Sequence, residues 1–134
     1  MIGIDVDWYD DTKTTLHVVY GKSFSLEDFY ASIDTSYMMM ESVSCIIDIV
    51  QDLTDLSALP PNVFSILRYV EGKAHPRRGI TIVVGMNRFV KVMFDVGKTI
   101  APKSTANYRF VNTRDEAHQL LMSLRQARNQ QTEK

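Results

Sequence analysis

The sequence has little of what several large classes of protein depend on. It contains a single cysteine, Cys45, so an internal disulfide and a cysteine-rich zinc site are both excluded. None of its apolar runs approaches the roughly 18 residues that a membrane span needs. The first residues carry no cationic segment ahead of an apolar one, which argues against a signal peptide. We therefore expect a cytoplasmic protein without a membrane span.

An excess of one charge and the motifs of common enzymes are lacking too. Fifteen basic and 16 acidic residues give a net charge of −1, so no net field would recruit nucleic acid or an anionic membrane. The three histidines show no metal-ligand spacing and no nucleophile motif beside them, and we expect them on the surface. Asp5 and Asp7 superficially match an Asp-x-Asp phosphoryl-transfer motif, but they alternate along a predicted strand and Tyr9 breaks the pattern. We predict a protein that is not an enzyme and uses no cofactor or metal.

What the sequence does contain is a regular succession of strand and helix patterns. Apolar and polar residues alternate over 2–8 and again over 15–20, which predicts a hairpin with one wet face. Two shorter apolar runs without alternation, 44–50 and 80–85, predict strands covered on both faces, and the first of them would bury Cys45. A last strand is predicted over 108–113. Helical spacing of apolar residues occurs between the strands and after the last one, over 25–40, 60–70, 87–100 and 114–124.

The order β-β-α-β-α-β-α-β-α predicts one α/β domain. Strands separated by helices imply a mostly parallel sheet with right-handed crossovers, and the opening hairpin adds an antiparallel edge to it. Ser25 with Asp28, and Thr113 with Glu116, have the spacing of capping boxes at the starts of two helices. We assign the domain to residues 1–127 and expect 128–134 to be a frayed polar tail.

Several segments together resemble the STAS fold, which occurs in anti-sigma-factor antagonists of the SpoIIAA type and in sulfate-transporter tails. The likeness is carried by the opening hairpin and first helix (6–34), the strand and loop at 45–62, the strand at 80–90, and the final strand and helix at 108–121. It is similar above all to stand-alone bacterial proteins grouped with the antagonist and with CRAL-TRIO lipid-transfer domains. The resemblance implies a regulatory interaction module, acting as a homodimer or through a partner protein.

The loop after the central strand carries the most specific part of this resemblance. Asp55, Leu56 and Ser57 match the Asp-Leu-Ser that precedes a phosphorylated serine in the antagonists. Pro61 and Asn62 occupy the positions where that serine would follow, and neither is a phosphoryl acceptor. The resemblance therefore implies the fold and the position of the loop, but not the phosphorylation switch.

Polar residues gather where two predicted parallel strands end. In such sheets ligands bind beyond the carboxyl ends of the strands, where helix N-termini offer free N–H groups. Three nearby aspartates raise the possibility of a metal, but Asp48 lies inside the strand, and Asp52 and Asp55 are expected to form turns or caps. We predict a ligand or partner loop, with no metal, made by Asp52, Thr54, Asp55, Ser57, Asn62, Gly85, Met86, Asn87 and Arg88.

Two helices carry more apolar residues than one buried stripe requires. Val90 and Phe94 flank the stripe of one helix, and Met38 and Met39 crowd the end of another. Such surface is covered within the monomer, by a second subunit, by a partner protein, or by a lipid-like ligand. Two functions follow: a non-catalytic regulatory module with exposed Val90 and Phe94, or a carrier that holds a small apolar molecule between its helices.

Overall fold

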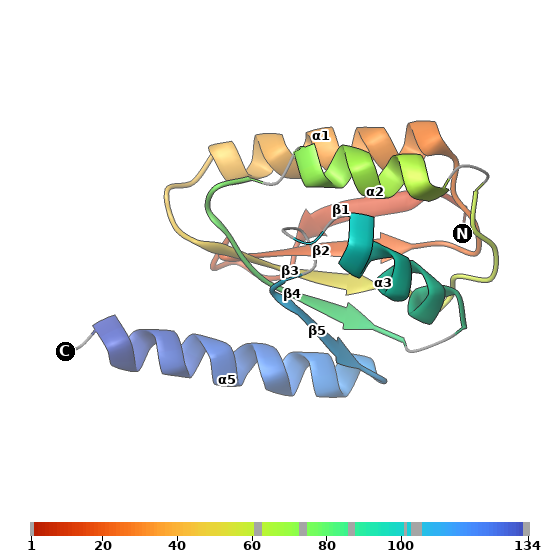
Figure 1. Ribbon diagram of the computed structural model, residues 1–134. Helices are drawn as coiled ribbons and strands as arrows, with labels where there is room; N and C mark the ends of the chain where they lie inside the picture. Colours follow the sequence, from red (N-terminus) through yellow and green to blue (C-terminus); the bar gives the residue numbers. More distant parts are fainter. Residues whose placement is uncertain are drawn as a thin grey trace.

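The protein is a five-stranded sheet with helices on both faces (Figure 1). The computed structural model describes residues 2–60, 63–72, 75–85, 88–100, 102 and 106–132. The strands are β1 (Ile4–Trp8), β2 (Thr15–Tyr20), β3 (Ile47–Asp52), β4 (Arg78–Val84) and β5 (Tyr108–Val111). The helices are α1 (Leu26–Glu41), α2 (Val63–Gly72), α3 (Arg88–Ile100) and α5 (Arg114–Thr132).

The sheet has the predicted mixed topology. Its strand order is β1-β2-β3-β4-β5, with β1 antiparallel to β2 and the other neighbours parallel. The hairpin register pairs Ile4 with Tyr20 and Trp8 with Leu16, which are the apolar positions of the two alternating patterns. The predicted element order and the antiparallel N-terminal hairpin are both confirmed.

The strand side chains divide between two cores because successive residues point to opposite faces. Leu16, Val18 and Ile49 lie on the face covered by α1, α2 and α3. Val50, Ile82 and the other residues of the second core meet α5 on the opposite face, where Ala117 and Leu121 supply the helix side. Figure 1 shows α5 alone on that face, on the side of the sheet where β4 and β5 lie.

Both ends of α1 are closed by side chains. Ser25 and Asp28 form the predicted capping box, each accepting a backbone N–H from the other. At the C-terminal end the Arg77 guanidinium donates to the carbonyl oxygens of Met40, Val43 and Cys45 at 3.0, 2.6 and 3.1 Å. Met40 is in the last turn of the helix, where its carbonyl also accepts the Val43 N–H at 3.3 Å, and Val43 and Cys45 follow the helix, so Arg77 fixes the helix end and the chain leading to β3.

Three sequence expectations are wrong in this region and at the C-terminus. Cys45 is exposed because β3 begins only at Ile47. His75 is buried, with its Nε2 2.9 Å from the Glu41 carboxylate and its Nδ1 accepting the Arg77 backbone N–H. Residues 128–132 belong to α5 rather than to a frayed tail, since that helix continues to Thr132.

None of the helices in the described residues combines the length and apolar character that crossing a membrane requires.

Candidate functional site

The predicted loop begins with a buried carboxylate that is already occupied. Asp52 is the last residue of β3, and its side chain is 3% exposed. One oxygen accepts the backbone N–H of Thr54 at 3.0 Å and the Thr54 hydroxyl at 2.5 Å, which is the expected Asx turn. The other oxygen accepts Nε–H of Arg114 at 2.5 Å. Asp52 thus fixes the start of the loop and the start of α5 together.

These contacts decide the ionisation of Asp52. Burial alone would raise the pKa of its carboxyl, but the hydrogen bonds from Thr54 and Arg114 outweigh burial and hold the pKa below its ordinary value. The same contact raises the pKa of Arg114. A carboxylate that stays charged and fully paired is suited to holding structure, whereas a general acid must carry a proton near neutral pH.

Residues 53–57, the rest of the loop, are held by buried side chains and by hydrogen bonds to the backbone. Leu53 and Leu56 are buried, and the Leu56 N–H donates to the Leu53 carbonyl at 3.2 Å to close a turn. The backbone N–H and the hydroxyl of Ser57 both donate to the Lys22 carbonyl, at 2.9 and 3.2 Å. Residues 53–57 are therefore fixed to both the core and the connection that leads from β2 to α1.

Gly85 brings the ends of β3 and β4 together. Its φ is +95°, a conformation that side-chain-bearing residues rarely adopt. A Cβ at this position would lie 3.0 Å from the Thr54 Cα, closer than a side chain normally comes to a backbone atom. The predicted approach of the two loops is thus present, between Thr54 and Gly85.

The structure places the remaining predicted site residues as follows. Asp55 is exposed, with its carboxylate 3.8 Å from the Arg114 guanidinium, and Thr54 and Ser57 are also exposed. Arg88 is exposed at the first residue of α3. Asn62, Met86 and Asn87 lie outside the described residues. Within the described part of the chain, no group of three or more His, Cys, Asp and Glu side chains is placed to hold a metal ion.

The proposed apolar interface is only partly exposed. Val90 is 3% exposed and packs into the core, so its assignment to a partner surface is wrong: the apolar face of α3 is wider than one stripe because the helix lies against the sheet. Phe94 is half-buried, with its ring 4.3 Å from that of Phe110. Met39 packs against the same core, while Met38 is 72% exposed.

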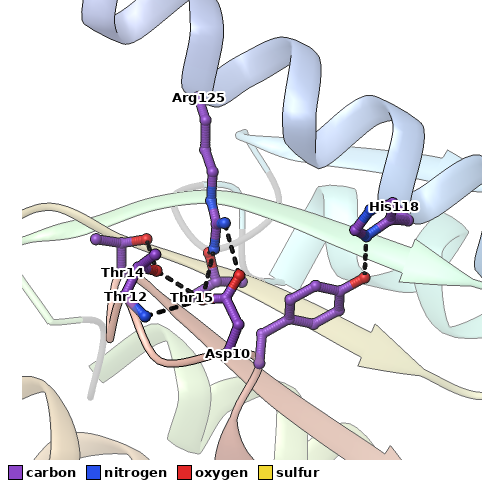
Figure 2. Close-up of polar contacts among 7 residues, drawn as sticks. Asp10, Thr12, Thr14, Thr15, His118 and Arg125 are labelled. Atoms are coloured by element: carbon purple, nitrogen blue, oxygen red, sulfur yellow. Dashed lines mark hydrogen bonds and ion pairs between the residues drawn. The ribbon is translucent and has the colours of Figure 1, made fainter.

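The sequence did not reveal a set of polar contacts that joins α5 to the sheet. Arg114 pairs with Asp52, Arg125 with Asp10, and Arg128 with Asp48. Figure 2 shows the Arg125 side chain reaching from α5 to the hairpin turn, where it bonds the Asp10 carboxylate at 2.7 and 3.2 Å and the Thr15 hydroxyl at 3.0 Å. The same view labels His118, and its Nδ1 lies 2.7 Å from the Tyr9 hydroxyl.

The spacing of residues along α5 could have predicted these contacts between α5 and the sheet. Arg114, His118, Leu121, Arg125 and Arg128 follow one another at intervals of three or four, so they share one face of α5. That face is directed at the sheet, where an aspartate in an otherwise apolar strand requires a cation as its partner.

Comparison with known proteins agrees with this architecture. A scan against protein-family models and a search of curated proteins both find no match. Among solved structures, an uncharacterized protein from the DUF3478 family with a SpoIIAA-like fold, from Shewanella loihica PV-4, aligns with a TM-score of 0.66 and 14% identity. The alignment covers 90% of this chain and 95% of that one. At this identity the likeness concerns the backbone arrangement, and the chain therefore has a SpoIIAA-like α/β fold.

Proposed function

We propose that this chain is a non-catalytic, regulatory protein-interaction module that binds its partner through the loop after β3. The observation that carries the proposal is the contrast within residues 52–57. The groups pointing inward are fully occupied, since Asp52 is paired with Arg114 and two leucines fill the space beneath. The groups pointing outward, Thr54, Asp55 and Ser57, are exposed.

A loop fixed in this way suits recognition. Side chains held in one conformation lose little entropy when a partner binds, so more of the contact energy appears as affinity. The hydroxyl protons of Thr54 and Ser57 are already donated to Asp52 and to the Lys22 carbonyl, so the exposed groups offer a partner acceptors: the Asp55 carboxylate and two hydroxyl oxygens. Arg88 at the start of α3 and the neighbouring Gly85 extend the proposed surface to the end of β4.

The packing under α1 argues against a carrier of apolar molecules. Aromatic rings in contact with one another lie between α1, α2 and the sheet, and the Phe29 and Tyr30 rings, 6.2 Å apart, join the two halves of the series. The ring centroids of Tyr20 and Phe24 are 5.1 Å apart, those of Phe24 and Phe29 6.3 Å, and those of Tyr30 and Tyr69 4.5 Å. A ligand held between the helices would have to displace these rings and forfeit their contacts.

Comparative capture tests the proposal. The wild-type chain, Asp55→Lys and Asp11→Lys are each immobilised and exposed to the same cell lysate. The proteins that each one binds are quantified by mass spectrometry. Asp11 is an exposed carboxylate of the hairpin turn, so its substitution makes the same charge change away from the loop. We expect a partner that the wild type and Asp11→Lys retain equally and Asp55→Lys loses. Equal retention by all three would refute the loop as the binding surface.

Native mass spectrometry separates the module from the carrier. We expect the protein to have its sequence mass under both native and denaturing conditions. Extra mass that disappears on denaturation would identify a bound small molecule and support the carrier. Covalent mass equal to phosphate would instead direct attention to modification of Thr54 or Ser57.

A further inference from the structure

β1 forms one outer edge of the sheet and is a surface separate from the loop after β3. β1 is at one end of the strand order, so it has a single neighbouring strand, β2. The Tyr9 N–H donates to the Thr15 carbonyl at 2.8 Å, and the Gly21 N–H donates to the Gly3 carbonyl at 2.8 Å. In an antiparallel pair such bonds join alternate residues, so the odd-numbered residues of β1 direct their backbone groups at β2.

The even-numbered residues must then direct theirs away from the sheet. These are Ile4, Val6 and Trp8. The Trp8 N–H confirms this direction, because it donates to the Asp7 carboxylate at 2.8 Å instead of to β2. Among the described residues no strand lies beyond β1, so Ile4 and Val6 present unpaired N–H and C=O groups along this edge. Such a row is a template for another strand.

The side chains beside this edge are acidic on one face. Asp5 and Asp7 are exposed and, being two residues apart, point to the same side of the sheet. Neither forms an ion pair with any other described residue. On the other side, Ile4, Val6 and Trp8 are half-buried against the core below α1.

Acidic and basic residues are distributed unevenly along the chain, although the net charge is close to zero. The first 55 residues carry 11 carboxylates and two cations, while the remaining 79 carry five carboxylates and 13 cations. The first group forms β1, β2, α1 and β3, and the second supplies β4, β5 and the other helices. Asp10, Asp48 and Asp52 are paired with arginines of α5, but Asp5 and Asp7 are in no ion pair among the described residues, so the β1 edge itself is acidic and attracts basic segments.

The same charges disfavour pairing between two β1 strands. An antiparallel pair centred on Val6 would place Asp5 of one copy opposite Asp7 of the other, twice. These positions do not exchange backbone hydrogen bonds across the edge, and side chains come closest in such pairs. Like charges directly opposite one another are destabilising. In a partner strand with basic residues opposite Asp5 and Asp7, both contacts are attractive instead of repulsive.

We propose that the β1 edge is a docking site for an extended segment of a partner protein, which adds to the sheet antiparallel to β1. The segment has basic side chains at two alternate positions, opposite Asp5 and Asp7, with an apolar residue between them opposite Val6. Its apolar residues exchange backbone hydrogen bonds with Ile4 and Val6. This surface is separate from the loop after β3, so the inference does not depend on the proposed function.

Titration with a model peptide tests the site. The probe is a capped nine-residue peptide that alternates valine and lysine, added to isotope-labelled protein at low salt, where surface charges are least screened. We expect the amide signals of Ile4 and Val6 to shift. The double variant Asp5→Asn, Asp7→Asn should weaken binding about fivefold or more, the sum of two cross-strand charge pairs. Asparagine keeps an oxygen for the Trp8 N–H, and Asp11→Asn is the control that removes one carboxylate from the hairpin turn.

Peptide variants test the backbone contacts without altering the protein. The N–H groups of the valines face β1 in the proposed register, and those of the lysines face away. Methylation of the central valine nitrogen should therefore abolish binding, while methylation of the nearest lysine nitrogen should leave it within about twofold. Equal effects of the two methyl groups, or equal binding by the double variant and Asp11→Asn, would overturn the proposal.

The oligomeric state provides a further test. Sedimentation at low and high salt is measured for the wild type and the double variant. We expect both to sediment alike at each salt concentration. Salt-sensitive self-association that the double variant loses would mean that a second copy occupies the edge, which would overturn the proposed partner. Failure of the alternating peptide to bind the wild type at millimolar concentration would overturn the site itself.

Discussion

Replacing Arg128 by methionine removes the cation that pairs with a carboxylate buried under α5. Asp48 is 1% exposed, and its two oxygens accept from the Arg128 guanidinium at 2.9 and 3.0 Å. One of these oxygens also accepts the Ile80 N–H at 2.9 Å. Gly79 leaves the space for this arrangement, because a Cβ there would overlap the Asp48 carboxylate.

The magnitude follows from what remains after the substitution. Asp48 would keep one hydrogen bond, from Ile80, and lose both contacts to a cation. Breaking a buried ion pair from one side costs about 3–5 kcal/mol. The Arg128 side chain is 36% exposed, so solvent already screens part of the interaction and we expect the lower end, about 3 kcal/mol. Truncation after Ala127 should cost a similar amount, because it removes the same guanidinium.

Urea unfolding followed by the fluorescence of the single tryptophan measures this loss. Arg109→Met is the matched control, since this arginine is exposed and, within the described part of the chain, its side chain donates only to the carbonyl of the adjacent Tyr108. We expect the control to stay within about 0.5 kcal/mol of the wild type. The double substitution of Asp48→Val with Arg128→Met should recover most of the lost stability, because no unpaired charge remains buried. A loss below about 0.5 kcal/mol in Arg128→Met would show that its ion pair with Asp48 does not stabilise the fold.

Three other substitutions have expected outcomes that the same unfolding assay checks. Thr81→Val should stabilise the protein by about 1 kcal/mol, because the Thr81 hydroxyl is fully buried and has no hydrogen-bond partner among the residues that the structure describes; a loss of stability would show that it has one. Hydrogen bonds from Arg125 and Thr12 lower the pKa of Asp10 from 3.8 to about 2, so the stability they provide is complete above about pH 4 and is lost as the pH falls toward 2. Asp10→Asn should remove that part of the acid dependence, and an unchanged pH profile would contradict the assignment. Met40→Ala should cost about 3 kcal/mol because Met40 is buried, whereas exposed Met38→Ala should change stability by less than about 0.5 kcal/mol. Equal effects of the two methionine substitutions would contradict the burial pattern.

The sequence predicted the elements well because their signals are local. The alternation along 2–8 and 15–20 fixes which side chains of the hairpin face the core, and the structure has this arrangement. The Ser25 capping box marks the start of α1 in both. Each of these features depends on residues within a few positions of one another, so tertiary packing does not change them.

The errors arose where distant residues decide the outcome. Arg128 looked like part of a polar tail, because its partner Asp48 lies 80 positions earlier in the chain. His75 stands in a turn-like segment, yet Glu41 and the ring of Tyr37, 4.6 Å away, enclose it. Val90 appeared surplus to the apolar stripe of its helix, since the width of the buried face depends on how α3 lies against the sheet. Helical spacing places Arg128 on one face of α5, but the partner in each of these contacts is set by tertiary packing and has no local signature.

Shift mapping on the complex tests the central claim most directly. Isotope-labelled chain is titrated with the partner recovered by comparative capture, and backbone amide signals are followed residue by residue. We expect the largest shifts on Thr54, Asp55 and Ser57, and we expect Asp55→Lys to remove them together with binding. Binding that leaves residues 53–57 unshifted would contradict the assignment of this loop as the interaction surface.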